Sequence, residues 1–371
     1  MPGSASGPHR CSYAFLLSPT LLNSDKMKKT SITAAALLIL AGCTDTIPIP
    51  SGMEDTALLM NAIISSADSV HHIILHGSKN PEGIVKAPDA EISFFVNGAL
   101  ADVTSRHQRE KYGIGEDYQL KARFAAGDTV RVEALFEGGC ATAEVIVPEA
   151  PVTGPVKQLE MISVPVNDYG NVEERDLWGL NIPLSDPAGA GNSYRLAKID
   201  VKCEAECIAD DDEGTERAQY SHLGNIESSS LDICFYTFMD PVFKSPGHDF
   251  RYSDAEYSVF NDRLFDGTTK NLYILTDKKC EIGPPYGKVR DGEVWVYRNK
   301  VRVLMESITP EAFRYLNAVQ YDGAYDLISI THVPTHYPSN VTGGLGYLVV
   351  CSASLTETAL EPKTYYGRTD Y

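Results

Sequence analysis

The alternation of apolar and polar residues between residues 57 and 147 constrains this fold most strongly, because turn residues interrupt it at short intervals. Asn97-Gly98 joins two of the alternating segments. This dipeptide is the strongest short signal for a hairpin, since both central residues of the turn need positive φ. Seven short strands in a segment of this length predict a mostly β fold, and we assign residues 56–149 to an immunoglobulin-like β-sandwich.

A Pro- and Gly-rich stretch over residues 148–155 then predicts a domain boundary. We expect residues 156–371 to form a larger β-rich domain with one or two short helices. Residues 293–307 alternate as a long strand does. One helix is expected over residues 254–265, and a second begins at Thr309-Pro310-Glu311, where an N-cap threonine precedes a proline and an acid.

The segment ahead of the sandwich has the layout of a bacterial secretory signal. Two lysines precede an apolar run over residues 32–40, and Ala41-Gly42-Cys43 follows. A cysteine directly after Ala-Gly indicates a lipoprotein signal, in which Cys43 is acylated and becomes the new N-terminus. The apolar run is too short to span a bilayer of about 30 Å. We therefore expect a protein anchored by its lipid in the outer membrane, on a face that the sequence leaves open.

On this interpretation residues 1–26 are an over-extended start, residues 27–42 a signal peptide and residues 43–55 a tether rich in proline and polar residues. The whole chain has a net charge of −18 and residues 1–42 contribute +3, so the chain from Cys43 onward carries −21. Such acidity argues against binding to nucleic acid or to an anionic lipid surface.

Six further cysteines are predicted to be either disulfide-bonded or buried thiols, because an exported compartment permits disulfides. They are Cys140, Cys203, Cys207, Cys234, Cys280 and Cys351. Six cysteines allow 15 pairings, so the sequence does not choose among them. A local bridge between Cys203 and Cys207, or a bridge to Cys234, is conceivable. A zinc site at Cys203 and Cys207 lacks a second ligand pair at the required spacing.

No pattern in the sequence nominates catalytic or cofactor-binding residues. It contains no Gly-x-Ser-x-Gly elbow, phosphate-binding loop or His-Glu-x-x-His helix. His72 and His76 share a strand face but lie too far apart for one metal. His332 and His336 form a weak candidate pair, and the acidic run Asp210–Glu213 lacks calcium-loop spacing. We expect no cofactor, no metal and no catalytic activity, with a hydrolase in the second domain as the remaining alternative.

Three segments carry a family resemblance. They are residues 186–195 (DPAGAGNSYR), residues 261–267 (NDRLFDG) and residues 338–347 (PSNVTGGLGY). In this order they resemble the motifs of a Bacteroidetes lipoprotein family catalogued as domain of unknown function 4249, although Ser193 stands where the family more often has an aromatic residue. The resemblance implies an outer-envelope lipoprotein often found beside TonB-dependent receptors. It implies no established chemistry and no catalytic residues.

The same segments can also be tight structural turns, and both interpretations stay open. The loop residues that would contact a ligand or partner are Asp186, Asn192, Asp266, Ser339, Asn340, Gly343 and Gly344. Our leading hypothesis is a non-catalytic, lipid-anchored protein that is an accessory or substrate-binding partner of a TonB-dependent transporter. The alternative is a structural or adhesion module of the cell surface.

Overall fold

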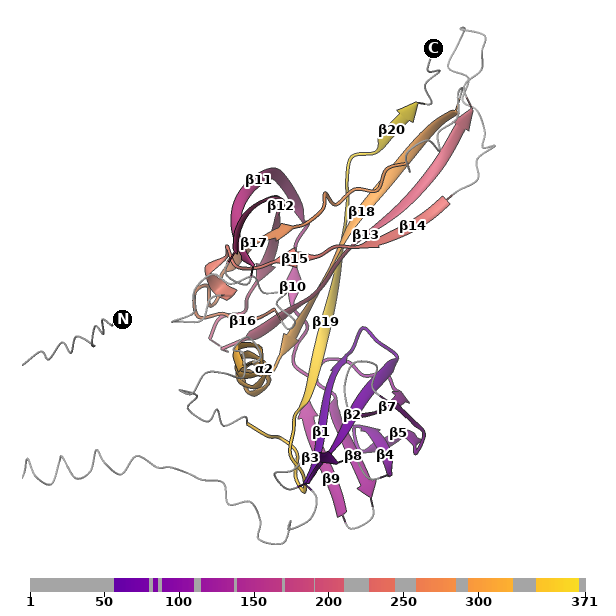
Figure 1. Ribbon diagram of the computed structural model, residues 1–371, viewed down its shortest axis with the longest axis vertical. Coiled ribbons are helices and arrows are strands. Elements are labelled where there is room, and N and C mark those ends of the chain that lie inside the picture. Colours follow the sequence, from indigo (N-terminus) through magenta and orange to yellow (C-terminus); the bar gives the residue numbers. More distant parts are fainter. Residues whose placement is uncertain are drawn as a thin grey trace, which may run out of the picture. The chain divides into compact units, whose positions relative to one another are not determined.

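The fold is mostly β, as predicted, in a computed structural model that describes most of the chain after residue 56. The described ranges are residues 57–79, 83–85, 89–109, 115–136, 139–168, 171–189, 191–209, 227–243, 258–284, 293–322 and 338–366. The predicted start, signal peptide, tether and Cys43 therefore lie outside the described residues. Within them, three sheets and one α-helix make up the body (Figure 1).

The largest sheet has eleven strands and draws on both ends of the described chain. They are β1 (Ala57–Ser65), β2 (Val70–Lys79), β3 (Gly83–Val85), β6 (His107–Arg109), β7 (Glu116–Lys121), β13 (Ser193–Ala209), β14 (Glu227–Asp232), β16 (Val259–Asn261), β18 (Glu293–Ile308), β19 (Leu348–Ala359) and β20 (Lys363–Tyr366). Their order is β14-β13-β18-β19-β1-β2-β7-β6, while β16 pairs with β13, β20 with β18 and β3 with β2.

Two smaller sheets accompany it. A five-stranded sheet contains β10 (Val152–Thr153), β11 (Lys157–Asp168), β12 (Asn171–Ser185), β15 (Phe235–Tyr236) and β17 (Thr269–Thr276). Its order is β10-β12-β17-β15, and β11 also pairs with β12. A four-stranded sheet contains β4 (Ala90–Val96), β5 (Ala99–Thr104), β8 (Thr129–Phe136) and β9 (Gly139–Ile146), in the order β5-β4-β8-β9.

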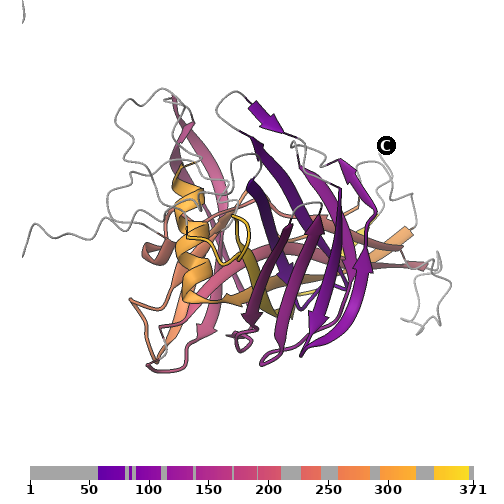
Figure 2. The same cartoon turned by 90° about the horizontal axis from the view of Figure 1, so that it is seen from below.

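The four-stranded sheet packs against β1, β2 and β7 of the large sheet, which gives a two-layered sandwich (Figure 2). Leu58, Met60 and Ile64 of β1 are each 1% exposed, so the predicted alternation gives this strand an inward apolar face. Burial of a side chain of this size contributes about 1.5–3 kcal/mol. The predicted hairpin between β4 and β5 is confirmed too, since Asn97 and Gly98 have φ of 51° and 79°. The immunoglobulin-like topology stays a prediction.

Strand β19 links this sandwich to the rest of the body. Its first residues pair in parallel with β1, from Ala62 opposite Leu348 to Ser65 opposite Cys351. Its later residues pair antiparallel with β18, from Ser352 to Ala359. The N-terminal sandwich thus includes a strand from the C-terminal part of the chain, while the predicted boundary near residues 148–155 stays a prediction.

A second core lies between the five-stranded sheet and the long strands β13 and β18. Leu180 and Ile182 of β12 pack in one cluster with Val201 of β13 and with Val301 and Val303 of β18. All five side chains are at most 1% exposed. The predicted alternation over residues 293–307 is therefore confirmed, with its apolar side turned into this core.

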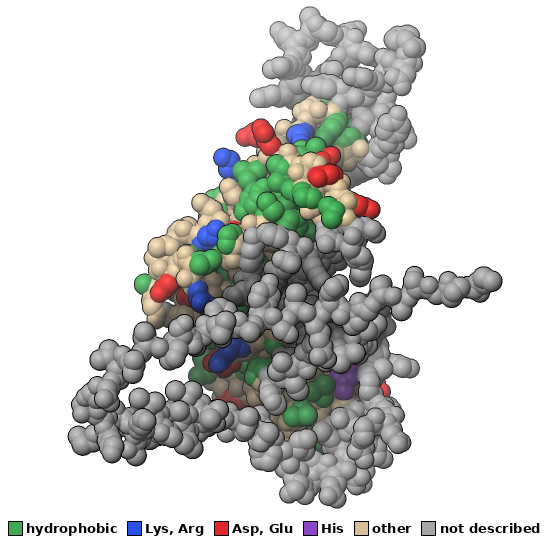
Figure 3. All heavy atoms as spheres, turned by 60° about the vertical axis from the view of Figure 1, so that its left-hand side comes forward, with side chains coloured by type: hydrophobic (Ala, Val, Ile, Leu, Met, Phe, Trp, Pro, Cys, Tyr) green, Lys and Arg blue, Asp and Glu red, His purple; other side chains and the backbone are tan. Residues whose placement is uncertain are grey.

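A smaller hydrophobic cluster lies where the C-terminal half of β13 pairs with the N-terminal half of β18. It contains Cys203, Ala205, Tyr297, Trp295, Tyr365 and Ile282. The rings of Tyr297 and Tyr365 meet edge to face, with centroids 5.3 Å apart. Figure 3 shows hydrophobic side chains gathered over the upper part of the body, where these strands lie.

Among the described cysteines, Cys140, Cys203, Cys280 and Cys351 are free thiols. The local bridge considered between Cys203 and Cys207 is wrong, because both residues lie on the extended strand β13. Four residues along a strand span about 13 Å, far beyond the reach of a disulfide. Cys234, the other partner considered, is exposed.

One of the two predicted helices is present. Helix α2 (Pro310–Asp322) begins after Thr309, whose Oγ1 accepts a hydrogen bond from the backbone N–H of Ala312 at 3.1 Å. This N-cap is the interaction that the sequence predicted. A single 3-10 turn, η1 (Pro241–Phe243), is also present. No helix in the described part of the chain is long and apolar enough to cross a membrane.

The helix predicted over residues 254–265 is wrong for the part of that range that the structure describes. Val259 and Phe260 belong to β16, where they pair with Arg195 and Tyr194 of β13. Both are at most 4% exposed, whereas Leu264, which would lie on the same side of a helix as Phe260, is 67% exposed. The pairing with β13 overrides the local spacing of apolar residues. Between residues 231 and 239 the chain forms only the end of β14 and the two-residue strand β15.

The sandwich core contains one buried histidine, His71. Its ring lies 5.3 Å from those of Phe94 and Phe124, and Nε2 is 3.3 Å from the carbonyl oxygen of Ala122. Nδ1 is buried and has no hydrogen-bond partner among the described residues. Burial lowers the pKa of His71, because the apolar surroundings disfavour the imidazolium.

We predict that His71 makes the fold sensitive to acid. The unfolded chain takes up the proton near pH 6.5 and the folded chain only at lower pH, so stability falls as pH drops through this window. The free energy of unfolding should fall by up to about 1.4 kcal/mol per pH unit. His71→Phe should flatten this dependence in urea unfolding between pH 7.5 and pH 5. His72→Gln, at the half-exposed neighbour, should keep it; equal slopes in wild type and His71→Phe would contradict the assignment.

Candidate functional site

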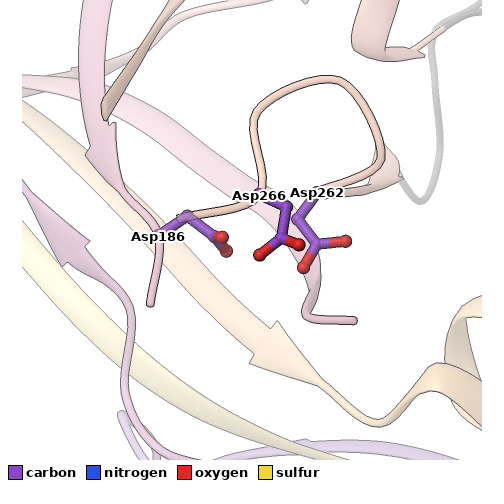
Figure 4. A group of neighbouring side chains, drawn as sticks. All are labelled: Asp186, Asp262 and Asp266. Carbon is purple, nitrogen blue, oxygen red and sulfur yellow. The ribbon is translucent and has the colours of Figure 1, made fainter. Parts of the chain in front are cut away.

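Two of the three motifs meet at one place in the structure. Asp186 directly follows β12, Asn192 precedes β13, and Asp262 and Asp266 lie in the turns after β16. The carboxylates of Asp186, Asp262 and Asp266 point toward one another (Figure 4), and ligand atoms of all three lie within 4.8 Å of one another. We call these three residues the aspartate cluster.

Asp186 is the centre of the hydrogen bonding. Its Oδ1 accepts a bond from the Tyr194 hydroxyl at 2.5 Å and one from the Asn192 side-chain amide at 3.2 Å. Its Oδ2 accepts from the backbone N–H of Gly267 at 2.9 Å. Asp186 is only 8% exposed, so these donors replace the water that it would otherwise bind.

The other two carboxylates bind backbone N–H groups of the facing loop. Asp262 accepts from the N–H of Asn192 at 2.6 Å, and Asp266 accepts from the N–H of Gly189 at 2.7 Å. Gly189 and Gly267 have φ of 82° and 69°, a region that favours glycine. The aspartate cluster thus fastens the loop between β12 and β13 to the turns after β16.

Burial governs the electrostatics of the site. It raises the pKa of the Asp262 carboxyl, and the nearby charges of Asp186 and Asp266 add to this rise. Burial likewise raises the pKa of Tyr194, helped by its hydrogen bond to Asp186, so the phenol stays protonated and donates. No lysine or arginine of the described chain forms an ion pair with the three aspartates.

The aspartate cluster contains the described residues best placed to hold a cation, but its oxygens are largely occupied. Four of the six carboxylate oxygens already accept hydrogen bonds from protein donors. Calcium needs six to eight oxygen ligands, and magnesium needs near-octahedral geometry. The chemistry that this arrangement supports is the bracing of two loops by charged acceptors.

The first motif also supplies a buried ion pair. Arg195 on β13 contacts Glu306 of β18, with Nη1 and Oε2 2.7 Å apart, and the Glu306 side chain is 1% exposed. The two residues are direct partners in the strand register. Removing one member of such a pair is costly because it leaves the other charge buried without a partner.

The third motif lies elsewhere, at the start of β19. The Asn340 side chain imitates a neighbouring strand, because its Oδ1 accepts from the N–H of Leu348 and its Nδ2 donates to the Leu348 carbonyl, both at 2.8 Å. Ser339 Oγ accepts from the N–H of Val341 at 3.2 Å. Both side chains are therefore engaged with the backbone of their own segment.

The glycines of this motif let three backbone segments come together. A Cβ on Gly343 would lie 2.1 Å from the carbonyl oxygen of Cys140, and one on Gly344 would lie 2.8 Å from that of Leu58. At Gly346 the corresponding distance to the Met60 carbonyl oxygen is 2.2 Å. No side chain fits at such distances, so the loop is built to lie against β1 and β9.

The structure therefore brings together Asp186, Asn192 and Asp266, and places Ser339, Asn340, Gly343 and Gly344 on a separate loop. Sequence reasoning did not single out Asp262 or Tyr194, although both lie within the quoted motifs. Asp262 accepts its hydrogen bond from Asn192, 70 residues earlier in the chain, and no local pattern signals such a contact. Tyr194 lies only eight residues from Asp186, but the sequence does not show that the loop between them brings the two side chains together.

Of the residues considered as metal ligands, His72 contacts the carboxylate of Asp117, with Nδ1 and Oδ2 2.9 Å apart. His332, His336 and the acidic run Asp210–Glu213 lie outside the described residues.

A comparison with family models identifies the class of protein that this combination of sheets and motifs defines. The model described as "Domain of unknown function (DUF4249)" matches residues 44–357. The chain belongs to this family, which confirms the resemblance found in the sequence. No curated protein and no solved structure matches the chain.

We predict opposite effects for two substitutions in the aspartate cluster. Asp186→Asn should lower the free energy of unfolding by about 2–3 kcal/mol, because an amide cannot accept on both sides and leaves a buried donor unpaired. Asp262→Asn should be neutral or stabilising at pH 7, since one amide oxygen still accepts from Asn192 and the repulsion is gone. Its effect should shrink between pH 7 and pH 4, because the raised pKa of Asp262 makes the folded wild-type carboxyl take up its proton at a higher pH than the unfolded one does. Urea unfolding of both variants at the two pH values tests this; a large loss with Asp262→Asn would contradict it.

The close approach at Gly343 yields a second prediction. Gly343 and Gly98 have almost the same φ, 77° and 79°, but a Cβ on Gly98 meets nothing within 4 Å. Gly98→Ala should cost about 1–2 kcal/mol from backbone strain alone. Gly343→Ala carries the same strain and must also push the Cys140 backbone away, so it should cost at least about 2 kcal/mol more. Thermal unfolding of the pair measures the difference, and similar melting temperatures would refute the packing argument.

Proposed function

We propose that this chain is a lipid-anchored envelope protein without catalytic activity that partners a TonB-dependent outer-membrane transporter. The observation that carries this proposal is the signal ending in Leu40-Ala41-Gly42-Cys43, placed ahead of a β-rich body. Acylated Cys43 anchors that body to the outer membrane, because an N-terminal cysteine with several acyl chains binds a bilayer stably.

The hydrogen bonds of the motif residues fit a structural role for the motifs in this proposal, rather than a catalytic one. Asp186, Asn192 and Asp266 contact one another or backbone N–H groups, and Asn340 binds the backbone of Leu348. Such residues hold loops in place and leave the outer surfaces of the sheets to make external contacts. We accordingly assign the partner-binding role to those surfaces rather than to the motifs.

The family membership and the acidity of the chain add to the proposal. A net charge of −18 opposes binding to nucleic acid and to anionic lipid headgroups, which directs the search toward a protein partner or a transported solute. The alternative function, a structural or adhesion module of the cell surface, uses the same anchor but needs no transporter.

The test is copurification of the tagged full chain from the detergent-solubilised envelope of its own host, followed by mass spectrometry. We expect a TonB-dependent transporter in roughly stoichiometric amount. Cys43→Ser should leave the membrane fraction and lose the transporter, because the acyl acceptor is gone. Cys140→Ser, which alters an exposed thiol of β9, is the matched control and should behave as wild type.

A lipid-anchored chain that purifies without any transporter would refute the partnership and favour the adhesion module. A Cys43→Ser variant that stays in the membrane fraction after salt washing would refute the anchor.

A further inference from the structure

The outer face of the four-stranded sheet exposes an unusual amount of apolar surface. Leu100 and Val103 of β5 are 57% and 45% exposed, Leu135 of β8 is 48% exposed and Ile146 of β9 is 67% exposed. The opposite face of this sheet is the one packed into the sandwich core. A regular sheet with both faces apolar is typical of a sheet covered on both sides.

The strand register makes part of this surface continuous. Phe95 of β4 is opposite Leu100 of β5 on one side and opposite Arg131 of β8 on the other. The Arg131 guanidinium lies over the Phe95 ring, 4.0 Å from its centroid. Val103 is opposite Ser93 on the same face. The outer face thus combines apolar side chains from all four strands with charged side chains gathered around Arg131.

Acidic groups outnumber basic ones on this outer face. Arg131 forms ion pairs with Glu133 and, at 3.9 Å, with Glu144. Glu91, opposite Leu135 in the register, is exposed as well. Three carboxylates against one guanidinium give the face a negative charge beside its apolar area.

We infer that this outer face is the docking surface for a protein partner whose contact surface combines apolar side chains with lysine or arginine. Charge decides among the occupants: a second copy would bring the same carboxylates face to face, and an anionic lipid surface would repel them. The inference rests on the proposed function, in which the partner is the transporter, and it names the surface that the transporter contacts.

The first test uses a photo-crosslinking amino acid placed in the full-length chain in its own host. At Leu135 it should form an adduct with the transporter, and the linked peptide should carry lysine or arginine. At Val172 on β12, which is 68% exposed, it should form none. Adducts with a second copy or with lipid, equal adducts at both positions, or no adduct at Leu135 would overturn the inference.

The second test uses matched variants. Leu100→Ser with Leu135→Ser should reduce the copurified transporter at least about tenfold, the scale expected for exposed apolar contacts at an interface. Met161→Ser with Val172→Ser changes side chains of β11 and β12 that are at least 48% exposed, as Leu100 and Leu135 are, and should leave the amount of copurified transporter unchanged. Glu91→Lys should reduce it, whereas Glu160→Lys, exposed on β11, should not. Thermal melts that match wild type show that each variant folds.

These outcomes separate the two proposals. If no transporter copurifies with the wild-type chain, the partnership and the docking surface both fail. If the transporter copurifies with wild type and with Leu100→Ser/Leu135→Ser alike, the partnership stands and the docking surface is refuted.

Discussion

The parallel pairing of β1 with β19 is the contact on which the rest of the body depends. It sets Ala62 opposite Leu348, nearly the full length of the described chain away. Closing so long a loop costs chain entropy that only extensive burial can offset. Val349 and Val350 of β19 are fully buried, and the same strand continues along β18. One strand therefore serves the sandwich core and the core between the larger sheets.

The third motif, residues 338–347, holds the start of β19 beside β1 in the sheet. Met60 donates its N–H to the Leu345 carbonyl at 2.9 Å, and Ala62 donates to that of Tyr347 at 3.1 Å. Asn61 Oδ1 accepts both the Tyr347 N–H at 3.0 Å and the Tyr315 hydroxyl at 3.1 Å, which ties α2 to the same place. The glycines are required because the backbones meet at distances that exclude a Cβ. A surface turn would not need them.

Local structure was predictable from the sequence wherever a few neighbouring residues decide it. The inward face of β1, the Asn97-Gly98 turn and the Thr309 cap each follow from residues within one turn or strand. Residues 254–265 show the limit of such reasoning. There, the pairing of Val259 with Arg195 stabilises a strand although the local pattern of apolar residues is helical. No local feature of the sequence indicates a pairing partner so far away in the chain.

The same distinction explains the candidate site. The motifs could be read from the sequence, but their role depends on which donors reach the carboxylates once the chain is folded. Asp186, buried and bonded on both oxygens, has little left to offer a ligand. The outer face of the four-stranded sheet differs from Asp186 in this respect, since Leu100 and Leu135 are exposed and do not contribute to the hydrophobic core. Residues that make internal contacts specify the fold. A partner can gain binding free energy by covering exposed apolar residues that the fold does not need.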